Sequence, residues 1–218
     1  MNRAVAIYRS SIGKKAIMAI TGMIGIGFVI GHMIGNLQMF QGPEKLNAYA
    51  ETLRAYPALL YFARFVLVSA VILHIIAAYQ LTRMSWDGRD SGYNKWKPVG
   101  SDYASRTMRW SGPILLLFII YHLLDFTFGP TNPDFVPGDV YHNVIASFSV
   151  WWVTAFYIVS MLALGLHMYH GIWSMFQSLG LNDPKFNQCW KNLSVIITAV
   201  VVIGNIVMPL AVFLEFVR

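Results

Sequence analysis

The stretch from Gly27 to Phe40 reads GFVIGHMIGNLQMF and is apolar enough to lie in a membrane. It nevertheless carries His32 near its middle, and an ionisable ring inside a bilayer is costly enough to indicate a functional site. Four residues would share the face of His32 on a helix: Gly25, Phe28, Gly35 and Asn36. Glycines beside a histidine leave room for a flat, wide ligand. Alternatively, the glycines spaced by four form a helix-packing face, and His32 only hydrogen-bonds to a neighbouring helix.

The composition indicates an integral membrane protein. The chain has 218 residues, of which 56% are hydrophobic and 12% charged, whereas soluble domains carry about 25% charged residues. Its long apolar runs do not alternate with polar residues, so we expect an all-α transmembrane bundle and not a β-barrel. Cys189 is the single cysteine, which excludes an internal disulfide, a four-cysteine iron–sulfur cluster and covalent C-x-x-C-H haem attachment. We expect one domain over residues 1–218.

Five transmembrane helices can be drawn from the apolar runs and their proline and glycine boundaries. They cover residues 16–40, 58–82, 110–128, 144–177 and 193–216. The first run is too long for a signal-peptide core of roughly 7–15 residues, so we expect a retained helix. The polar connection between the first two spans predicts a short surface helix over residues 44–53.

The basic residues predict the orientation of these spans. With five spans, the N-terminal segment and the second and fourth connections lie on one side of the membrane. They hold 12 of the 16 Lys and Arg residues: Arg3, Arg9, Lys14, Lys15, Arg83, Arg89, Lys95, Lys97, Arg106, Arg109, Lys185 and Lys191. The positive-inside rule therefore predicts a cytoplasmic N-terminus. This asymmetry accounts for the net charge of +6 without a nucleic-acid partner.

Four histidines lie inside four different spans and fall at two depths. At 1.5 Å per residue, His32 and His122 lie roughly 12 and 10 Å from the outer ends of their helices. His74 and His167 lie roughly 13 and 15 Å from the cytoplasmic ends of theirs. The sequence therefore predicts an outer pair and an inner pair of imidazoles on facing helices, which favours two b haems, each held by two histidines.

Two other uses of these histidines are less consistent with the pattern. A zinc ion needs about four ligands at one point, and these lie at two levels. A proton relay does not require matched pairs flanked by small residues.

Haem propionates need cationic or hydrogen-bonding partners. For the outer haem we expect Arg64; alternatively, the Arg64 side chain extends to the lipid headgroups at the outer surface. For the inner haem the candidates are Arg83, His170 and Ser174, and His170 could instead replace His167 as a ligand.

Three motifs resemble one family of membrane anchors. These are SSIGKKAIMAITG over 10–22, GHMIGNLQMF over 31–40 and HMYHGIWSMFQSLG over 167–180. They are similar to the five-helix, two-haem cytochrome b subunit of succinate:quinone oxidoreductases, the succinate dehydrogenase cytochrome b558 family, and the resemblance extends over essentially the whole chain.

The resemblance implies a non-catalytic, electron-transferring subunit of respiratory complex II in a bacterial cytoplasmic membrane. A flavoprotein subunit with FAD would oxidise succinate to fumarate, and an iron–sulfur subunit would carry electrons to this chain. The three subunits would form a heterotrimer, and whether heterotrimers assemble further stays open. By position, His74 and His167 would bind the proximal haem, and His32 and His122 the distal one. The basic face would dock the iron–sulfur subunit and bring Ser10, Ser11 and Lys14 near a proximal quinone site.

On this interpretation a quinone, which the resemblance implies is menaquinone, binds near the outer face. The candidate residues there are Asn36, Gln38, Glu44 and Asp125; simple surface polarity is the alternative for Gln38 and Glu44. The sequence departs from some fumarate reductases of this class at Gly165, where they keep a glutamate proposed to transfer protons. Two other functions stay open: a di-haem anchor of a formate dehydrogenase or hydrogenase, and a small transporter.

Overall fold

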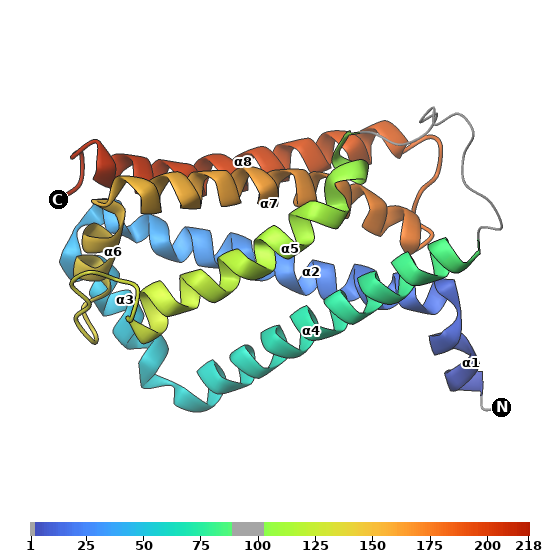
Figure 1. Cartoon of the computed structure of the whole chain (residues 1–218), viewed down its shortest axis with the longest axis horizontal. Helices are drawn as coiled ribbons and strands as arrows, with labels where there is room; N and C mark the ends of the chain where they lie inside the picture. Colours follow the sequence, from blue (N-terminus) through green and yellow to red (C-terminus); the bar gives the residue numbers. More distant parts are fainter. Residues whose placement is uncertain (1–2, 89–102) are drawn as a thin grey trace.

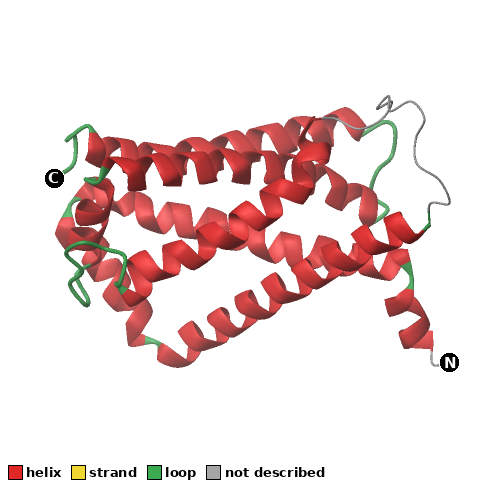
Figure 2. Ribbon diagram, in the orientation of Figure 1, coloured by secondary structure: helices red, strands yellow, loops and turns green. Residues whose placement is uncertain are grey.

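The computed structural model describes residues 3–88 and 103–218, which form helices and no strand (Figure 2). Arg89, Lys95 and Lys97, which contribute to the charge asymmetry, lie outside the described residues. Five helices in the described part are long and apolar enough to cross a membrane, so the chain is a multi-pass helical membrane protein. They are α2 (Ser11–Asn36, continued by the 3-10 turn η1, Leu37–Gln41), α4 (Pro57–Asp87), α5 (Tyr103–Leu123, continued by the π-helical turn η2, Leu124–Phe128), α7 (Trp151–Ser178) and α8 (Asn187–Phe213).

The first span begins earlier than predicted and follows a separate short helix, α1 (Arg3–Arg9). Ser10 separates the two helices. Its extended backbone and its hydroxyl, which accepts a hydrogen bond from the Gly13 amide at 3.0 Å, start α2 at Ser11. Lys14 is then buried against α1, where its Nζ donates to the Tyr8 carbonyl at 3.1 Å.

The predicted surface helix is present as α3 (Pro43–Ala55), and both α3 and α4 begin with a proline. Proline suits the first turn of a helix because its missing N–H would have no partner there and its φ is already helical. Gly42 precedes α3 with φ 97°. This left-handed backbone is readily adopted by glycine and turns the chain sharply out of the first span.

The predicted continuous span over 144–177 is wrong at its start, because the structure divides it into α6 (Val140–Phe148) and α7. Val150 is extended, with φ −87° and ψ 114°, and separates the two helices. The Thr154 hydroxyl donates to the Phe148 carbonyl at 2.8 Å and so satisfies a carbonyl that α6 leaves unpaired at its end. The apolar pattern continues through this break, so hydropathy alone could not locate it.

The five long helices run side by side along the molecule, with the two chain termini at opposite ends (Figure 1). Helix α7 packs against α2, α5 and α8, and α2 packs against α4. Two glycines let α8 pack closely: a Cβ on Gly165 of α7 would lie 2.9 Å from Val202, and one on Gly204 of α8 would overlap the Met33 sulfur of α2. Helices α4 and α5 form no extended interface in the described chain. Helices α4, α2, α7 and α5 thus surround an interior whose α4–α5 side is not closed by helix packing.

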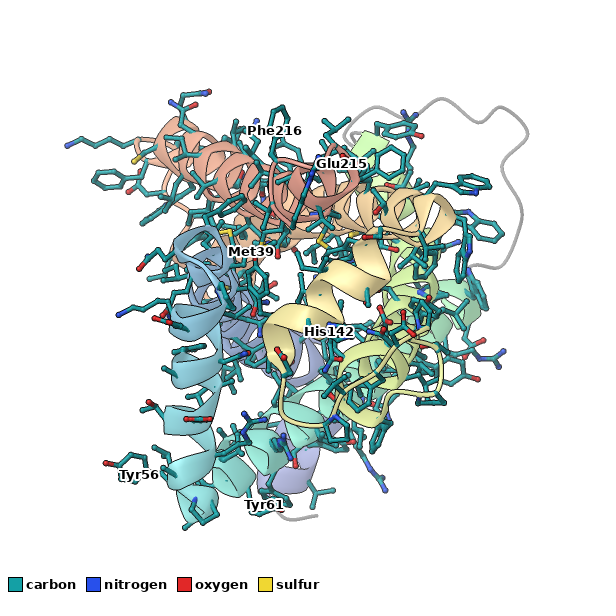
Figure 3. The ribbon with its side chains drawn as sticks, turned by 90° about the vertical axis from the view of Figure 1, so that its left-hand side faces the viewer. Met39, Tyr56, Tyr61, His142, Glu215 and Phe216 are labelled. Atoms are coloured by element: carbon teal, nitrogen blue, oxygen red, sulfur yellow. The ribbon has the colours of Figure 1, made fainter. Side chains whose placement is uncertain are left out.

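Helices α3 and α6 cap the end of the bundle opposite the N-terminus (Figure 1). Figure 3 shows this end, with His142 on α6 near the middle and Tyr56 and Tyr61 at one edge. Asp139 joins the two cap helices: its carboxylate accepts hydrogen bonds from the His142 amide at 3.0 Å and the Asn47 side chain at 2.9 Å. These bonds and the nearby His142 ring lower the pKa of Asp139 below its ordinary value.

Candidate cofactor site

The four histidines inside the spans form two pairs across the interior surrounded by α2, α4, α5 and α7. His74 of α4 faces His167 of α7, with ring centroids 6.1 Å apart and ring planes inclined by 53°. His32 of α2 faces His122 of α5, with centroids 5.7 Å apart and planes at 87°. Each pair joins helices that are diagonal in this arrangement, and the pairs lie at two levels, as the depth of each residue along its helix predicts.

The spacing within each pair suits one metal ion between two imidazoles. A metal–imidazole bond is about 2 Å long, so two such bonds plus the ring radii require centroids about 6 Å apart. Among the described residues, no three His, Cys, Asp or Glu side chains gather where they could hold one ion. The donor set therefore fits two ions with two protein ligands each, as in a haem with two axial histidines.

Hydroxyl groups hold both rings of the His74–His167 pair. Thr21 Oγ1 lies 3.0 Å from Nδ1 of His74 and donates its own proton to the Ile17 carbonyl at 2.7 Å. Ser111 Oγ lies 3.2 Å from Nδ1 of His167 and donates to the Met108 carbonyl. Each hydroxyl has one proton, so it accepts from the imidazole, and Nδ1 carries the ring proton. Nε2 of both histidines is then the nitrogen with a free lone pair for a metal.

The two rings of the His32–His122 pair have unlike partners. Tyr157 Oη lies 3.4 Å from Nδ1 of His122 and donates to Oδ2 of Asp125 at 2.9 Å. At His32 the contact is on the other nitrogen, because the Asn36 amide Nδ2 lies 3.0 Å from Nε2. A metal on Nε2 of His32 would therefore replace the hydrogen bond from Asn36.

The glycines near the histidines distinguish the two interpretations of the first span. A Cβ on Gly25 or Gly171 would meet no other atom within 4 Å, so open space lies on the histidine faces of α2 and α7. Gly27 and Gly31 are exposed with nothing close to them, and Gly35 approaches the Tyr49 ring of the cap. Gly27 and Gly31 therefore make no close contact with any described helix, and packing within the described bundle does not account for them.

The candidate propionate partners lie at both ends of the bundle. Arg64 is exposed on α4, with its guanidinium 5.8 Å from the Tyr61 ring centroid. Arg83 is exposed and paired with Asp87 at 3.8 Å. His170 is half-buried one turn along α7 from His167. Ser174 lines a groove of ≈ 290 Å³ between α2 and α7, together with Lys15 and Gln177. The structure therefore leaves the propionate roles of these residues as predictions.

Two of the four residues predicted near an outer quinone lie beside the His32–His122 pair. Asn36 contacts His32 directly, and Asp125 reaches His122 through Tyr157. Glu44 is exposed in the first turn of α3, and Gln38 is half-buried in η1. At the opposite end, Ser11 is exposed, whereas Lys14 is buried and held by Tyr8.

Buried polar atoms without a hydrogen-bond partner in the described chain gather near Asp125. They are the Tyr121 hydroxyl, Oδ1 of Asp125, Oγ1 of Thr131 and Oδ1 of Asn132, all between the end of α5 and the loop that follows η2. Buried polar groups are rarely left unpaired, and exceptions often mark a place for water or a ligand. This region is thus a polar part of the described interior, and Asp125 connects it to the His32–His122 pair through Tyr157.

The sequence did not indicate Thr21, Ser111, Tyr157 or Ser147 as site residues. Each is a single hydroxyl in an apolar run, where helix-packing serine and threonine are common. An isolated hydroxyl in such a run is the only signal that could have found them, and it is weak. Each makes its contact with a residue of a different helix, and such contacts depend on how neighbouring helices are rotated about their axes.

Fold and site together define a multi-pass helical membrane protein with two stacked histidine pairs suited to haem. Residues 89–207 match the family model of the succinate dehydrogenase/fumarate reductase transmembrane subunit. The chain belongs to this family. It is 23% identical over 177 residues to the succinate dehydrogenase cytochrome b558 subunit of Bacillus subtilis (strain 168), a match that covers 80% of this chain and 83% of that protein. No solved structure matches the chain.

Proposed function

We propose that this chain is the cytochrome b anchor of a succinate:quinone oxidoreductase and holds two b haems. His74 and His167 bind one haem, and His32 and His122 bind the other. The observation that carries this proposal is the stacking of two histidine pairs across one interior, with ring centroids 6.1 and 5.7 Å apart. The relative from Bacillus subtilis, which is named a cytochrome b558 subunit, supports it.

The bound haems would supply one-electron oxidation and reduction at two depths of the membrane. The chain's own part is to orient the imidazoles and to keep water from them. Thr21, Ser111 and Tyr157 accept the Nδ1 protons and leave Nε2 free to bind iron. Cys189 is exposed on α8 and cannot supply the two thioether bonds of a covalently attached haem.

The partners of this anchor are a flavoprotein subunit and an iron–sulfur subunit, which carry FAD and the iron–sulfur clusters. Dicarboxylate chemistry takes place on the flavoprotein subunit, and this chain transfers electrons only. We place the soluble subunits at the N-terminal end of the bundle, on the cytoplasmic side of a bacterial inner membrane. The concentration of Lys and Arg in the segments at that end supports this orientation.

We propose that menaquinone binds near the His32–His122 pair, at the end of the bundle capped by α3 and α6. Asn36 and Asp125 are the best-supported residues there because they contact the pair, directly or through Tyr157. Among the unpartnered polar atoms near Asp125, the Thr131 hydroxyl can donate to a quinone carbonyl, and Oδ1 of Asp125 can accept from a quinol hydroxyl. Gln38 and Glu44 are further candidates. An Asp125→Asn variant should slow quinone turnover, and unchanged quinone kinetics would remove Asp125 from this site.

At the other end, Ser11 and Lys14 are candidates for a proximal quinone site. Ser174, Arg83 and His170 are the candidates for the propionates of the His74–His167 haem, and Ser174 lines the groove that also contains Lys15. Arg64 is the candidate for the other haem, and its position on α4 toward the capped end supports that assignment.

The direct test is succinate-driven reduction in the purified complex with its soluble subunits. Adding succinate should produce the α-bands of reduced b haem, and added menaquinone analogue should reoxidise them. The matched variant is His122→Ala, which should keep a succinate-reducible haem at His74–His167 and lose fast reoxidation. A chain that purifies with formate dehydrogenase or hydrogenase subunits and does not respond to succinate would contradict the proposal.

A further inference from the structure

A buried chain of hydrogen bonds runs from a carboxylate to one candidate haem ligand. Asp125, in the π-helical turn η2, has no exposed surface. Its Oδ2 accepts hydrogen bonds from the Ser147 hydroxyl at 2.7 Å and from the Tyr157 hydroxyl at 2.9 Å. The oxygen of Tyr157 then lies 3.4 Å from Nδ1 of His122. Three helices, α5 with its η2 extension, α6 and α7, therefore meet at this chain.

The direction of each hydrogen bond follows from the number of protons. Tyr157 has one hydroxyl proton, and it points to Asp125. The phenol oxygen can therefore only accept from His122, so Nδ1 of His122 carries the ring proton. A metal-bound histidine whose other N–H is held by an acceptor is a more basic ligand and has a fixed ring orientation.

Tyr157 cannot easily turn away from this position. It is 5% exposed and lies inside a cluster of aromatic rings. Its ring centroid is 4.9 Å from that of Phe148 and 5.2 Å from that of Phe118, both nearly perpendicular to it. Ser147 donates to the same carboxylate oxygen and is itself fully buried. The geometry is thus determined from several helices and not by one flexible side chain.

We infer that Tyr157 is a positioning residue for the second haem site, with Asp125 holding its hydroxyl proton. Tyr157 fixes the Nδ1–H of His122 and strengthens Nε2 as an iron ligand, which stabilises the oxidised haem bound by His32 and His122. At the His74–His167 site Thr21 and Ser111 accept the Nδ1 protons, but their own protons go to backbone carbonyls, so neither hydroxyl is backed by a carboxylate as Tyr157 is. This inference rests on the proposed function, since it requires a haem between His32 and His122.

The test is a redox titration of the two haems in the whole complex that carries Tyr157→Phe, followed at the α-bands. This variant keeps the ring and its packing and removes only the acceptor. The reduction equilibrium of one haem should shift toward the reduced form by roughly tenfold, about 59 mV for one electron. The other haem should not move, and its presence shows that the bundle is folded.

Tyr121→Phe is the matched control. Tyr121 belongs to the same aromatic cluster, with its centroid 6.1 Å from that of Tyr157, but its hydroxyl has no partner in the described chain. This control should leave both midpoints unchanged, and Ser111→Ala should shift the other haem. Two haems with midpoints unmoved by Tyr157→Phe would overturn the inference and leave the proposed function intact. A wild-type complex without haem would overturn both.

Discussion

The two histidine pairs have nearly the same spacing but differ in what surrounds them. The His74–His167 pair is supported symmetrically, with one hydroxyl on each Nδ1 from the neighbouring helices α2 and α5. The His32–His122 pair is asymmetric: His122 is held by Tyr157, whereas His32 has its Nε2 bonded to Asn36. The second pair also lies toward the cap of α3 and α6. The two pairs therefore combine nearly the same ring spacing with different hydrogen-bond partners on the imidazole rings. These partners would give two chemically identical haems different properties.

The largest effect should come from removing one ligand of either pair. His167→Ala should abolish the haem at His74–His167 and leave the other, and His122→Ala should do the reverse. Each variant should retain half of the wild-type haem, with a different α-band remaining, because the pairs share no ligand. Haem quantified per chain checks this, and a variant that loses both haems at once would show that the pairs are not independent.

The next effect concerns the hydroxyls of the symmetric pair. Thr21→Val and Ser111→Ala should each weaken haem binding at His74–His167 by about 10–100-fold, the usual cost of losing such a partner. Haem transfer to an acceptor protein such as apomyoglobin measures this loss. The control is Ser160→Ala, since the Ser160 hydroxyl donates to the Phe156 carbonyl. Equal losses from all three variants would mean that the effect is general destabilisation.

A smaller effect is expected from the cap that covers one pair and not the other. Asp139 caps α6 and joins it to Asn47 of α3, so Asp139→Ala should cost about 1 kcal/mol of stability. Because its folded pKa is lowered below 3.8, this stabilisation is complete at neutral pH. It is lost as the pH falls through the folded pKa.

Thermal unfolding of the detergent-solubilised complex at about pH 7 and about pH 3 measures the stabilisation that Asp139 contributes. The Asp139→Asn variant keeps an N-cap acceptor but cannot titrate, and its melting temperature should fall less than that of wild type on acidification. Equal falls in the two proteins would show that Asp139 makes no contribution to acid sensitivity.

The smallest effect is expected from Asn36, which contacts His32 in the asymmetric pair. Asn36→Ala removes a hydrogen bond that iron must displace from Nε2 of His32. One such bond contributes roughly 1 kcal/mol, so affinity for this haem should rise a few-fold and not fall. The same haem-transfer measurement checks it. A loss of haem would show that Asn36 supports the bound state, for instance from a different side-chain orientation.

Much of this arrangement could be predicted from residue positions along the helices. Because an α-helix rises by a fixed 1.5 Å per residue, the distance of His32, His74, His122 and His167 from their helix ends was enough to predict which rings meet. The polar composition of the first connection predicted a surface helix over 44–53, which is present as α3 with somewhat longer bounds, Pro43–Ala55. The break at Val150 could not be predicted, because apolar residues continue through it and the Thr154–Phe148 hydrogen bond forms only once the chain has turned there.

The hydrogen-bond partners of the histidine rings could not be predicted for a related reason. Thr21, Ser111 and Tyr157 reach their imidazoles from other helices, so the contacts depend on how each helix is rotated and how deeply it packs. Asp125 was predicted near the outer quinone, but its connection to His122 requires the position of α7 and of Ser147 on α6. Depth follows from sequence alone, whereas rotation requires the packed structure.

The central claim is that two haems are bound, one by each pair. The reduced-minus-oxidised optical spectrum of the purified complex, with protohaem quantified per copy of this chain, tests it most directly. The account predicts two b haems per chain, both low-spin with two histidine ligands. A single haem would mean that one pair is structural and would remove the electron path between the two levels, and a complex without haem would contradict the account altogether.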